Sequence, residues 1–295
     1  MVLRRDGGGL TVRSPSKINL TLDIRKRRSD GFHDIETVFA ALEFGDDLAF
    51  AIEPDNALTL RVRDCTGGLS TPLPVDSRNL IMQAAELLRE RAGCRSGAAI
   101  TLWKRVPVEA GLGGGSANAA ATLLALNNLW SLNLGRDRLT EMAAELGSDV
   151  AFFVSGVPYA VGRGRGEEIE QIPSPLRLQV VLVKPASGLS AGAVYRAVEP
   201  GDTEETTRMI RGLEHGDFAD VVSALSNGLQ EPAQRLSSEV SKVCDAMRRE
   251  LPGRVLMSGS GTTCFAISRS KREVSRVAER LRQQRLGHVF VTHTL

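Results

Sequence analysis

The feature that constrains this chain most is a glycine-rich loop joined directly to an alanine-rich helix. Residues 107–126 read PVEAGLGGGSANAAATLLAL, with glycine at positions 111, 113, 114 and 115. Glycine permits backbone conformations closed to other residues, and its missing Cβ lets a ligand approach the main chain. Because alanine is a strong helix former, we expect a helix to begin at about Ser116 and run to Leu129. The N–H groups and the dipole of such a helix start favour a bound phosphate.

Familiar phosphate-loop motifs do not match this segment. A Walker loop requires a Gly-Lys pair, which the whole chain lacks. A dinucleotide fingerprint starting at Gly111 would need glycine at position 116, where serine stands. The protein-kinase signatures H-R-D and D-F-G are also absent. A plain glycine-rich surface turn is the structural alternative, and the continuous alanine helix argues against it.

Length and composition indicate a folded chain of one large or two medium domains. The 295 residues carry a formal net charge of +2, and 42% of them are hydrophobic, which is ordinary globular usage. A near-neutral charge argues against a nucleic-acid partner. No apolar run is long enough to span a membrane, and the cysteines and histidines lack zinc-site spacing. We therefore expect a cytoplasmic protein with no membrane partner.

The alternation of strands and helices predicts an α+β fold. Hydrophobic spacing predicts a helix over 79–91, capped by Ser77 and ended by Gly93. A Pro-Ser-Pro segment at 173–175 precedes a new buried strand, so we place domains at 1–173 and 174–295. The other predicted elements are strands at 10–25, 35–44, 47–52, 98–106, 177–185, 254–257, 263–268 and 288–292, and helices at 138–146, 236–251 and 271–285.

Five segments resemble one enzyme superfamily, the GHMP kinases, which include galactokinase, homoserine kinase, mevalonate kinase and phosphomevalonate kinase. GLGGGSANAAA (111–121) is similar to the second motif of that superfamily, SPSKINL (14–20) to its N-terminal strand motif, and SGSGTTCFA (258–266) to its C-terminal glycine motif. DGFHDIETVF (30–39) and LGSDVAFF (146–153) are similar to the 4-diphosphocytidyl-2-C-methyl-D-erythritol kinase family within it. The motifs stand in matching order over nearly the whole chain.

The resemblance implies a fold and a reaction. The fold has an N-terminal α/β domain and a ferredoxin-like C-terminal domain, with the active site in the cleft between them. The reaction transfers the γ-phosphoryl group of ATP, with Mg²⁺, to the 2-hydroxyl of the methylerythritol part of a small molecule that carries a cytidine diphosphate group. That step belongs to the methylerythritol phosphate route to isoprenoid precursors. Monomer and homodimer are both compatible with the resemblance.

The resemblance also assigns two catalytic residues. Asp149 matches the family's catalytic base, and Lys17 matches the lysine that pairs with it and polarises the same hydroxyl. A nearby cation keeps a carboxylate ionised and stabilises developing alkoxide charge. Judged alone, Lys17 in its apolar strand is more often an exposed edge residue, and Asp149 is equally well a helix cap. Both alternatives weaken in a chain that also carries the glycine loop.

Five residues match positions that bind the substrate, namely Asn19, Phe32, His33, Phe39 and Tyr195. Asn19 lies on the strand face that carries the catalytic lysine, and His33 matches a residue that reads cytosine. Phe32, where many relatives carry tyrosine, and Tyr195 match the two aromatic residues that hold the base between them. Phe39 is also a candidate, although an aromatic residue at this spacing is more often part of the core.

The nucleotide is assigned to the loop and its flanks: Asn79, Pro107, Val108, Glu109, Ala110, Gly111, Leu112, Gly113, Gly114, Gly115, Ser116 and Ala117. Ser116 matches a donor to the β-phosphate or a ligand of Mg²⁺, or is a plain N-cap. Glu109 and Ala110 stand where close relatives often carry glycine, and we expect the Glu109 side chain to point to solvent. No acidic Mg²⁺ ligand is assigned.

Several readings stay open from the sequence. Gly259 and Gly261 either pack against the glycine loop or form a simple turn. Another small-molecule kinase of the superfamily, acting on homoserine or mevalonate, is one alternative function, and a non-catalytic nucleotide-binding module is another. The segment GRGRG at 162–166 has no assigned role.

Overall fold

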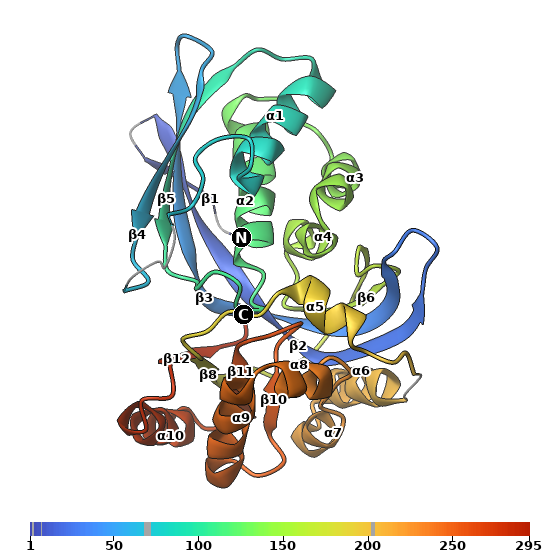
Figure 1. The fold of residues 1–295 in the computed structure, drawn as a ribbon. Helices are drawn as coiled ribbons and strands as arrows, with labels where there is room; N and C mark the ends of the chain where they lie inside the picture. The colour runs from blue at the N-terminus through green and yellow to red at the C-terminus, as the bar shows by residue number, and fades with distance from the viewer. Residues whose placement is uncertain (2, 7, 68–71, 202–203) are drawn as a thin grey trace. The chain divides into compact units, whose positions relative to one another are not determined.

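The structure, a computed structural model, describes residues 1–295 except 2, 7, 68–71 and 202–203 (Figure 1). Contacts between residues group the chain into two compact units. The first unit contains Met1–Ser16, Phe44–Val108 and Gly113–Val157, and the second contains Lys17–Glu43, Glu109–Leu112 and Pro158–Leu295. The division of the sequence at residues 173 and 174 stays a prediction.

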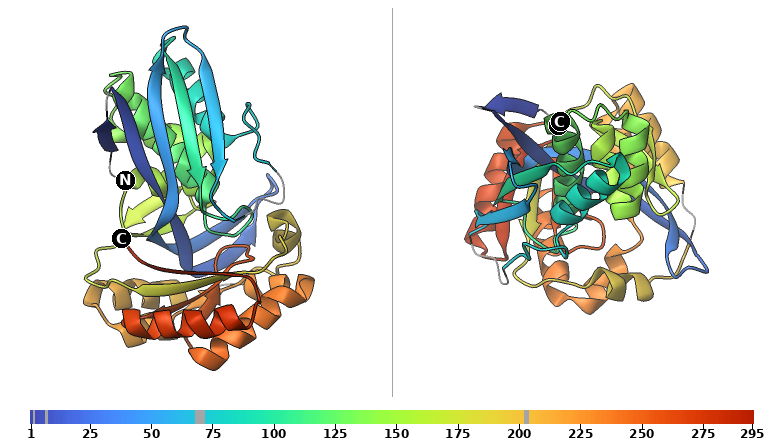
Figure 2. Two further views of the ribbon diagram at one scale, coloured as in Figure 1. Left: turned by 90° about the vertical axis from the view of Figure 1, so that its left-hand side faces the viewer. Right: turned by 90° about the horizontal axis from the view of Figure 1, so that it is seen from above.

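The first unit is a sheet with helices on one face (Figure 1, Figure 2). Its strands follow the order β1 (Leu3–Asp6), β2 (Gly9–Arg27), β3 (His33–Glu53), β5 (Gly97–Lys104) and β4 (Leu58–Asp64). Strands β2 and β3 are long, and their remaining residues belong to the second unit. The helices are α1 (Leu80–Ala92), α2 (Gly114–Leu129), α3 (Arg136–Leu146) and α4 (Ser148–Ser155).

Helix α2 is the centre of this layer because its small residues let neighbouring helices approach closely. It contacts α1, α3 and α4, and its alanines are almost entirely buried. The alanine-rich sequence therefore serves both helix formation and close packing.

The second unit contains the other ends of β2 and β3, to which β6 (Tyr159–Arg163), β7 (Glu168–Gln171) and β9 (Ser226–Asn227) are added. It also has an antiparallel sheet in the order β10 (Val255–Met257), β11 (Cys264–Ser268), β8 (Gln179–Lys184) and β12 (His288–His293). Helices α9 (Ser238–Glu250) and α10 (Lys271–Gln283) pack on this sheet. The remaining helices are α5 (Ala191–Arg196), α6 (Glu205–His215), α7 (Phe218–Ser223) and α8 (Gln230–Leu236).

The predicted α+β class and the ferredoxin-like arrangement of the C-terminal sheet are confirmed. Some local details differ from the sequence prediction. The strands expected at 35–44 and 47–52 form the single strand β3. The cap of α1 is Asn79, whose side chain accepts from the N–H of Ile81 at 3.0 Å, and the predicted cap Ser77 is wrong.

Within the described residues, no helix has the length and apolar character needed to cross a membrane.

Candidate active site

Lys17 is buried in β2, and its ammonium belongs to a chain of polar side chains. Nζ donates to Asn19 Oδ1 at 2.7 Å, and Asn19 Nδ2 donates to Thr37 Oγ1 at 2.8 Å. Thr37 Oγ1 in turn donates to the carbonyl of Thr21 at 2.6 Å. Since Lys17 is only 4% exposed, the alternative of a solvated edge lysine is wrong. Asn19 and Lys17 share one strand face, as the sequence predicted.

The aromatic ring of Phe39 lies next to the Lys17 ammonium. Lys17 Nζ lies 5.6 Å from the centroid of the Phe39 ring, a distance at which a cation is attracted to a π face. The ring is 1% exposed, and it packs so tightly on Gly162 that a Cβ there would lie 2.6 Å from Phe39 Cε2. Phe39 is therefore a core residue that positions the lysine, and its direct contact with a substrate stays a prediction.

The front of the glycine loop, residues 109–112, is held by hydrogen bonds to its main-chain carbonyls. The N–H of Lys17 donates to the carbonyl of Leu112 at 2.9 Å. Ser258 Oγ donates to the carbonyl of Gly111 at 2.9 Å. Gly111 has a φ of +71°, and a Cβ at this position would lie 2.1 Å from the Ser258 carbonyl oxygen. Only glycine fits here, because the two turns are in direct backbone contact.

The SGSG turn contacts both the loop and the lysine. A Cβ at Gly259, where φ is +56°, would lie 3.4 Å from each of three atoms, Asn19 Oδ1, Lys17 Nζ and the Gly111 carbonyl oxygen. The carbonyl of Gly259 accepts from Asn227 Nδ2 at 2.9 Å, which holds the turn from its other side. The turn therefore packs against the glycine loop and is more than a simple hairpin connection.

Helix α2 starts with no side-chain cap. Gly113 is the N-cap, with a φ of +68°, and the helix begins at Gly114. Ser116 is thus the third helical residue, so the reading of Ser116 as the N-cap is wrong. The first-turn N–H groups and the helix dipole favour an anion at this end. The helix begins two residues earlier than the sequence suggested, and phosphate binding at its start stays a prediction.

A buried carboxylate that the sequence did not single out holds the same helix start. Asp46 is fully buried and accepts four hydrogen bonds: from Lys104 Nζ at 2.6 Å, from the N–H groups of Arg105 and Val106 at 2.7 and 2.8 Å, and from Asn118 Nδ2 at 2.9 Å. It joins β3, the end of β5 and the first turns of α2. Burial lowers the pKa of Lys104, and Asp46 opposes that shift.

Asp149 lies in the first turn of α4, where a negative charge is favourable next to the helix dipole. The N-cap of this helix is Gly147, so Asp149 is not the cap. Asp149 belongs to the first unit and Lys17 to the second.

The residues predicted to hold cytosine form two ring contacts. His33 stacks on Tyr195, with ring centroids 5.4 Å apart and an angle of 29° between the planes. Phe32 is 53% exposed, and the Arg165 guanidinium lies 5.3 Å from its ring centroid. Burial, followed by the charge of Arg27, lowers the pKa of His33. The imidazole is therefore neutral at neutral pH and can both donate and accept a hydrogen bond.

Other predicted nucleotide residues differ in their surroundings. Asn79 is engaged as a helix cap, and its Nδ2 also donates to the Pro74 carbonyl at 2.8 Å. Glu109 is exposed, as expected, and its φ is +51°. Its carboxylate lies beside Gly188 and raises the pKa of Lys184, against the larger lowering effect of burial. Of the remaining residues, Pro107 is partly exposed, Val108 is exposed, and Ala110, Leu112 and Ala117 are buried.

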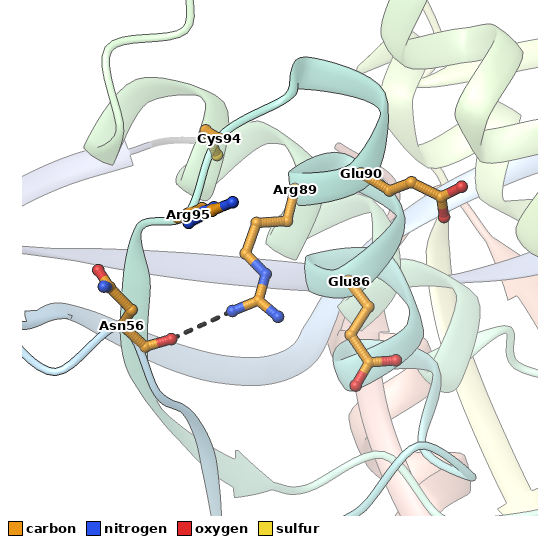
Figure 3. A pocket seen from close by; sticks show the side chains of 6 residues that line it. All are labelled: Asn56, Glu86, Arg89, Glu90, Cys94 and Arg95. Atoms are coloured by element: carbon orange, nitrogen blue, oxygen red, sulfur yellow. Dashed lines mark hydrogen bonds between the residues drawn. The ribbon is translucent and has the colours of Figure 1, made fainter.

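A surface pocket of about 420 Å³ lies at the C-terminal end of α1 (Figure 3). Arg89 Nη1 donates to the Asn56 carbonyl at 3.1 Å in this pocket. Its two glutamates and two arginines balance in charge, and none of the predicted site residues lines it. The lining residues are Asn56, Glu86, Arg89, Glu90, Cys94 and Arg95. In the described parts of the chain, no group of three or more His, Cys, Asp or Glu residues is placed to hold a metal ion.

The chain matches two family models and many individual proteins. GHMP kinases N terminal domain matches residues 79–157, and GHMP kinases C terminal matches residues 209–286. The 4-diphosphocytidyl-2-C-methyl-D-erythritol kinase of Shouchella clausii is 40% identical over 92% of this chain and 90% of its own length. The protein of the same name from Pelotomaculum thermopropionicum is 40% identical over 97% and 98%.

Solved structures agree with these matches. A crystal structure of 4-(cytidine 5'-diphospho)-2C-methyl-D-erythritol kinase superposes with a TM-score of 0.79 at 33% identity, covering 96% of this chain and 98% of that one. Homoserine kinase from Cytophaga hutchinsonii, at 15% identity and a TM-score of 0.76, covers 100% and 97% and shares the fold. On this evidence of sequence and fold, the chain belongs to the 4-diphosphocytidyl-2-C-methyl-D-erythritol kinase family of the GHMP kinases.

Proposed function

We propose that this chain transfers the γ-phosphoryl group of ATP to the 2-hydroxyl of 4-diphosphocytidyl-2-C-methyl-D-erythritol. The names of its relatives support the substrate, and one observation of the structure carries the chemistry. The Lys17 ammonium is buried between Asn19, Phe39 and the Gly259 turn, and its own N–H binds the carbonyl of Leu112 in the glycine loop. A fixed cation thus stands next to the proposed phosphate loop.

The roles of the charged residues follow from the needs of phosphoryl transfer. The acceptor is a tertiary alcohol, and such a reaction depends on positioning, on charge stabilisation and on a group that takes the hydroxyl proton. We assign the proton-accepting role to Asp149 and the stabilisation of the developing alkoxide to Lys17. Asn19 holds the lysine amine in place and contacts the substrate.

ATP is assigned to the glycine loop and the start of α2. The N–H groups of the first helical turn bind phosphate oxygens, and the exposed Gly115 leaves the main chain accessible. Mg²⁺ enters the proposal with ATP, because in such sites phosphates and waters supply most of its ligands. The Ser116 hydroxyl is the candidate protein ligand.

The cytidine part is assigned to Phe32, His33 and Tyr195. A neutral imidazole at His33 suits hydrogen bonding to a neutral base. The exposed Phe32 ring offers a π face for stacking, which contributes about 1 to 3 kcal/mol per base. The oligomeric state, monomer or homodimer, and the cytoplasmic location stay predictions.

The proposal is tested by identifying the product of a single reaction. Purified protein, Mg-ATP and the cytidyl substrate are mixed, and phosphorus NMR follows the mixture. We expect ADP to form together with one new phosphate monoester on the tertiary carbon, while the diphosphate signals of the substrate persist. Release of inorganic phosphate without a new ester would overturn the proposed transfer, because it would show hydrolysis of ATP alone.

A further inference from the structure

The segment GRGRG at 162–166, which had no assigned role from the sequence, contains the end of β6 and most of the turn that leads to β7. Gly164 has a φ of +69° and Gly166 a φ of +107°, conformations that favour glycine. The carbonyl of Gly164 accepts from the N–H of Ile35 at 2.7 Å. This bond attaches the turn to the start of β3, two residues after His33.

The turn presents Arg165 to the ring of Phe32. The guanidinium carbon lies 5.3 Å from the ring centroid. On its other side, Arg165 Nε donates to Glu167 Oε1 at 3.2 Å, and the Arg165 N–H donates to Glu167 Oε2 at 2.6 Å. The Arg165 and Glu167 side chains are 31% and 21% exposed. One carboxylate thus fixes both the main chain and the guanidinium of this arginine.

Phe32 lies at a turn, and its hydrogen bonds involve only its backbone groups in the part of the chain that the structure describes. Its N–H donates to Asp30 Oδ1 at 3.1 Å, and its carbonyl accepts from the N–H of Arg28 at 2.8 Å. These bonds fix the backbone, whereas 53% of the residue is exposed to solvent. Among the described residues, the guanidinium of Arg165 contacts the face of the ring, and this contact restricts the orientation of the ring.

We propose that Arg165 is a positioning residue for recognition of the cytosine base, acting through the ring of Phe32. This inference rests on the proposed function. A guanidinium is planar and stacks on aromatic faces, so it holds the ring in one orientation and leaves the opposite face for a second flat group. Restricting the ring before the base binds lowers the entropy cost of stacking. The charge of Arg165 is also the last of several causes that lower the pKa of Asp30, after the N–H of Phe32 and Arg28.

The first test compares binding of cytidine, CMP and CDP to variants by calorimetry. Arg165→Met keeps the length of the side chain and removes the charge and the planar group. We expect its Kd to rise by about three- to tenfold, equally for all three ligands, as a cation–π contact of this kind implies. Arg165→Lys keeps a cation over the ring and recovers part of the loss. Arg211→Met, a matched change at an exposed arginine on α6, leaves all three Kd values unchanged.

The second test is a double-mutant cycle with Phe32→Leu. If Arg165 acts through Phe32, adding Arg165→Met to Phe32→Leu causes no further loss of affinity. Additive losses, or losses that grow from cytidine to CDP, overturn the inference, since they show direct contact with the phosphates. In steady-state kinetics the KM for the cytidyl substrate rises, while kcat and the KM for ATP stay near the wild-type values.

Different binding results overturn the proposed function and the role of Arg165. A wild-type protein that binds none of the three cytidine ligands overturns the proposed function and this inference together. A wild-type protein that binds them, with unchanged affinity in Arg165→Met, overturns the inference alone. Thermal unfolding of each variant shows whether a loss of affinity reflects a loss of folded protein, and Arg165→Lys supplies the comparison if Arg165→Met is unstable.

Discussion

The N–H of Lys17 donates a hydrogen bond to the carbonyl of Leu112 at 2.9 Å. This bond joins a buried strand to the front of the glycine loop, two parts of the chain that are far apart in sequence. Ser258 completes the connection, because its hydroxyl binds the carbonyl of Gly111. The strand that carries the lysine proposed to act in catalysis is therefore joined to the front of the glycine loop by hydrogen bonds to the carbonyls of Gly111 and Leu112.

Glycine at position 111 is predicted to be required for full stability of the fold. Gly111→Ala places a Cβ about 2 Å from the Ser258 carbonyl oxygen, in a backbone conformation with a φ of +71°. The backbone strain alone costs about 1 kcal/mol or more, and the collision adds to it. Urea unfolding measures the loss of stability.

Gly115→Ala is the matched control for this change. Gly115 is helical, and its nearest neighbour to an added Cβ is Leu80 Cδ1 at 3.6 Å. Alanine favours the helix, so the stability should be equal or slightly higher. Equal destabilisation by both substitutions would contradict the packing described for the loop.

Asp46 is predicted to be the most sensitive buried charge of the first unit. Asp46→Asn leaves the Lys104 ammonium buried without its counter-charge. Each carboxylate oxygen accepts from two donors, so in either orientation the new NH2 group faces two N–H donors. Breaking a buried pair in this way typically costs about 3 to 5 kcal/mol. Thermal unfolding should show a large fall in Tm.

Asp47→Asn provides the comparison for Asp46. Asp47 pairs with Arg13 and Arg105, but its side chain is 36% exposed. Exposed ion pairs contribute about 1 kcal/mol or less. If the two variants were equally stable, Asp46 would not have the structural role assigned to it.

The pH dependence of substrate binding should follow His33. Because burial and Arg27 lower its pKa, the folded protein favours the neutral ring. Stability from this residue is fully present above the usual pKa of about 6.5 and is lost as the pH falls through the lowered value. The KM for the cytidyl substrate should be constant between about pH 7 and 8, where the ring is neutral. It should rise in acid, where the ring becomes protonated.

His33→Gln separates this effect from other titrations. Glutamine retains a donor and an acceptor but does not titrate in this range. The KM of the variant should therefore change little with pH. A wild-type KM that rises toward alkaline pH would argue against a neutral imidazole in recognition.

The sequence predicted the local elements better than the contacts between them. Strand β2, helix α1 and the start of α2 follow from hydrophobic spacing, from glycine and from alanine. The four bonds of Asp46 could not be predicted, because Lys104 and Asn118 reach it only through the pairing of β3 with β5 and the packing of α2. The Gly-Asp-Asp segment at 45–47 carries no sign in the sequence that its first aspartate has such a role.

The same limit applies around the proposed substrate site. Lys17 and Asn19 share a face because residues two apart in a strand point to the same side of the sheet. The sequence therefore predicts that the two side chains are neighbours, and the structure shows a hydrogen bond between them. The position of Arg165 over Phe32 depends on two turns that meet in three dimensions. No rule of sequence spacing relates residues 32 and 165. The contact between the Arg165 guanidinium and the Phe32 ring could therefore not be predicted from the sequence.

Asp149→Asn is predicted to separate catalysis from nucleotide binding. An amide of the same shape cannot accept the hydroxyl proton, so turnover should fall by roughly 10²- to 10⁴-fold, as for the loss of a general base. Binding of a non-hydrolysable ATP analogue, measured by calorimetry, should stay near normal. Loss of nucleotide affinity with unchanged kcat would assign Asp149 to the nucleotide site instead.

The identity of the phosphoryl acceptor is tested by comparing a panel of alcohols. Initial rates of ADP formation are measured with Mg-ATP and each of 4-diphosphocytidyl-2-C-methyl-D-erythritol, mevalonate and homoserine. We predict that only the cytidyl compound raises the rate clearly above that without an acceptor. Equal or higher activity on mevalonate or homoserine would contradict the assignment of the substrate.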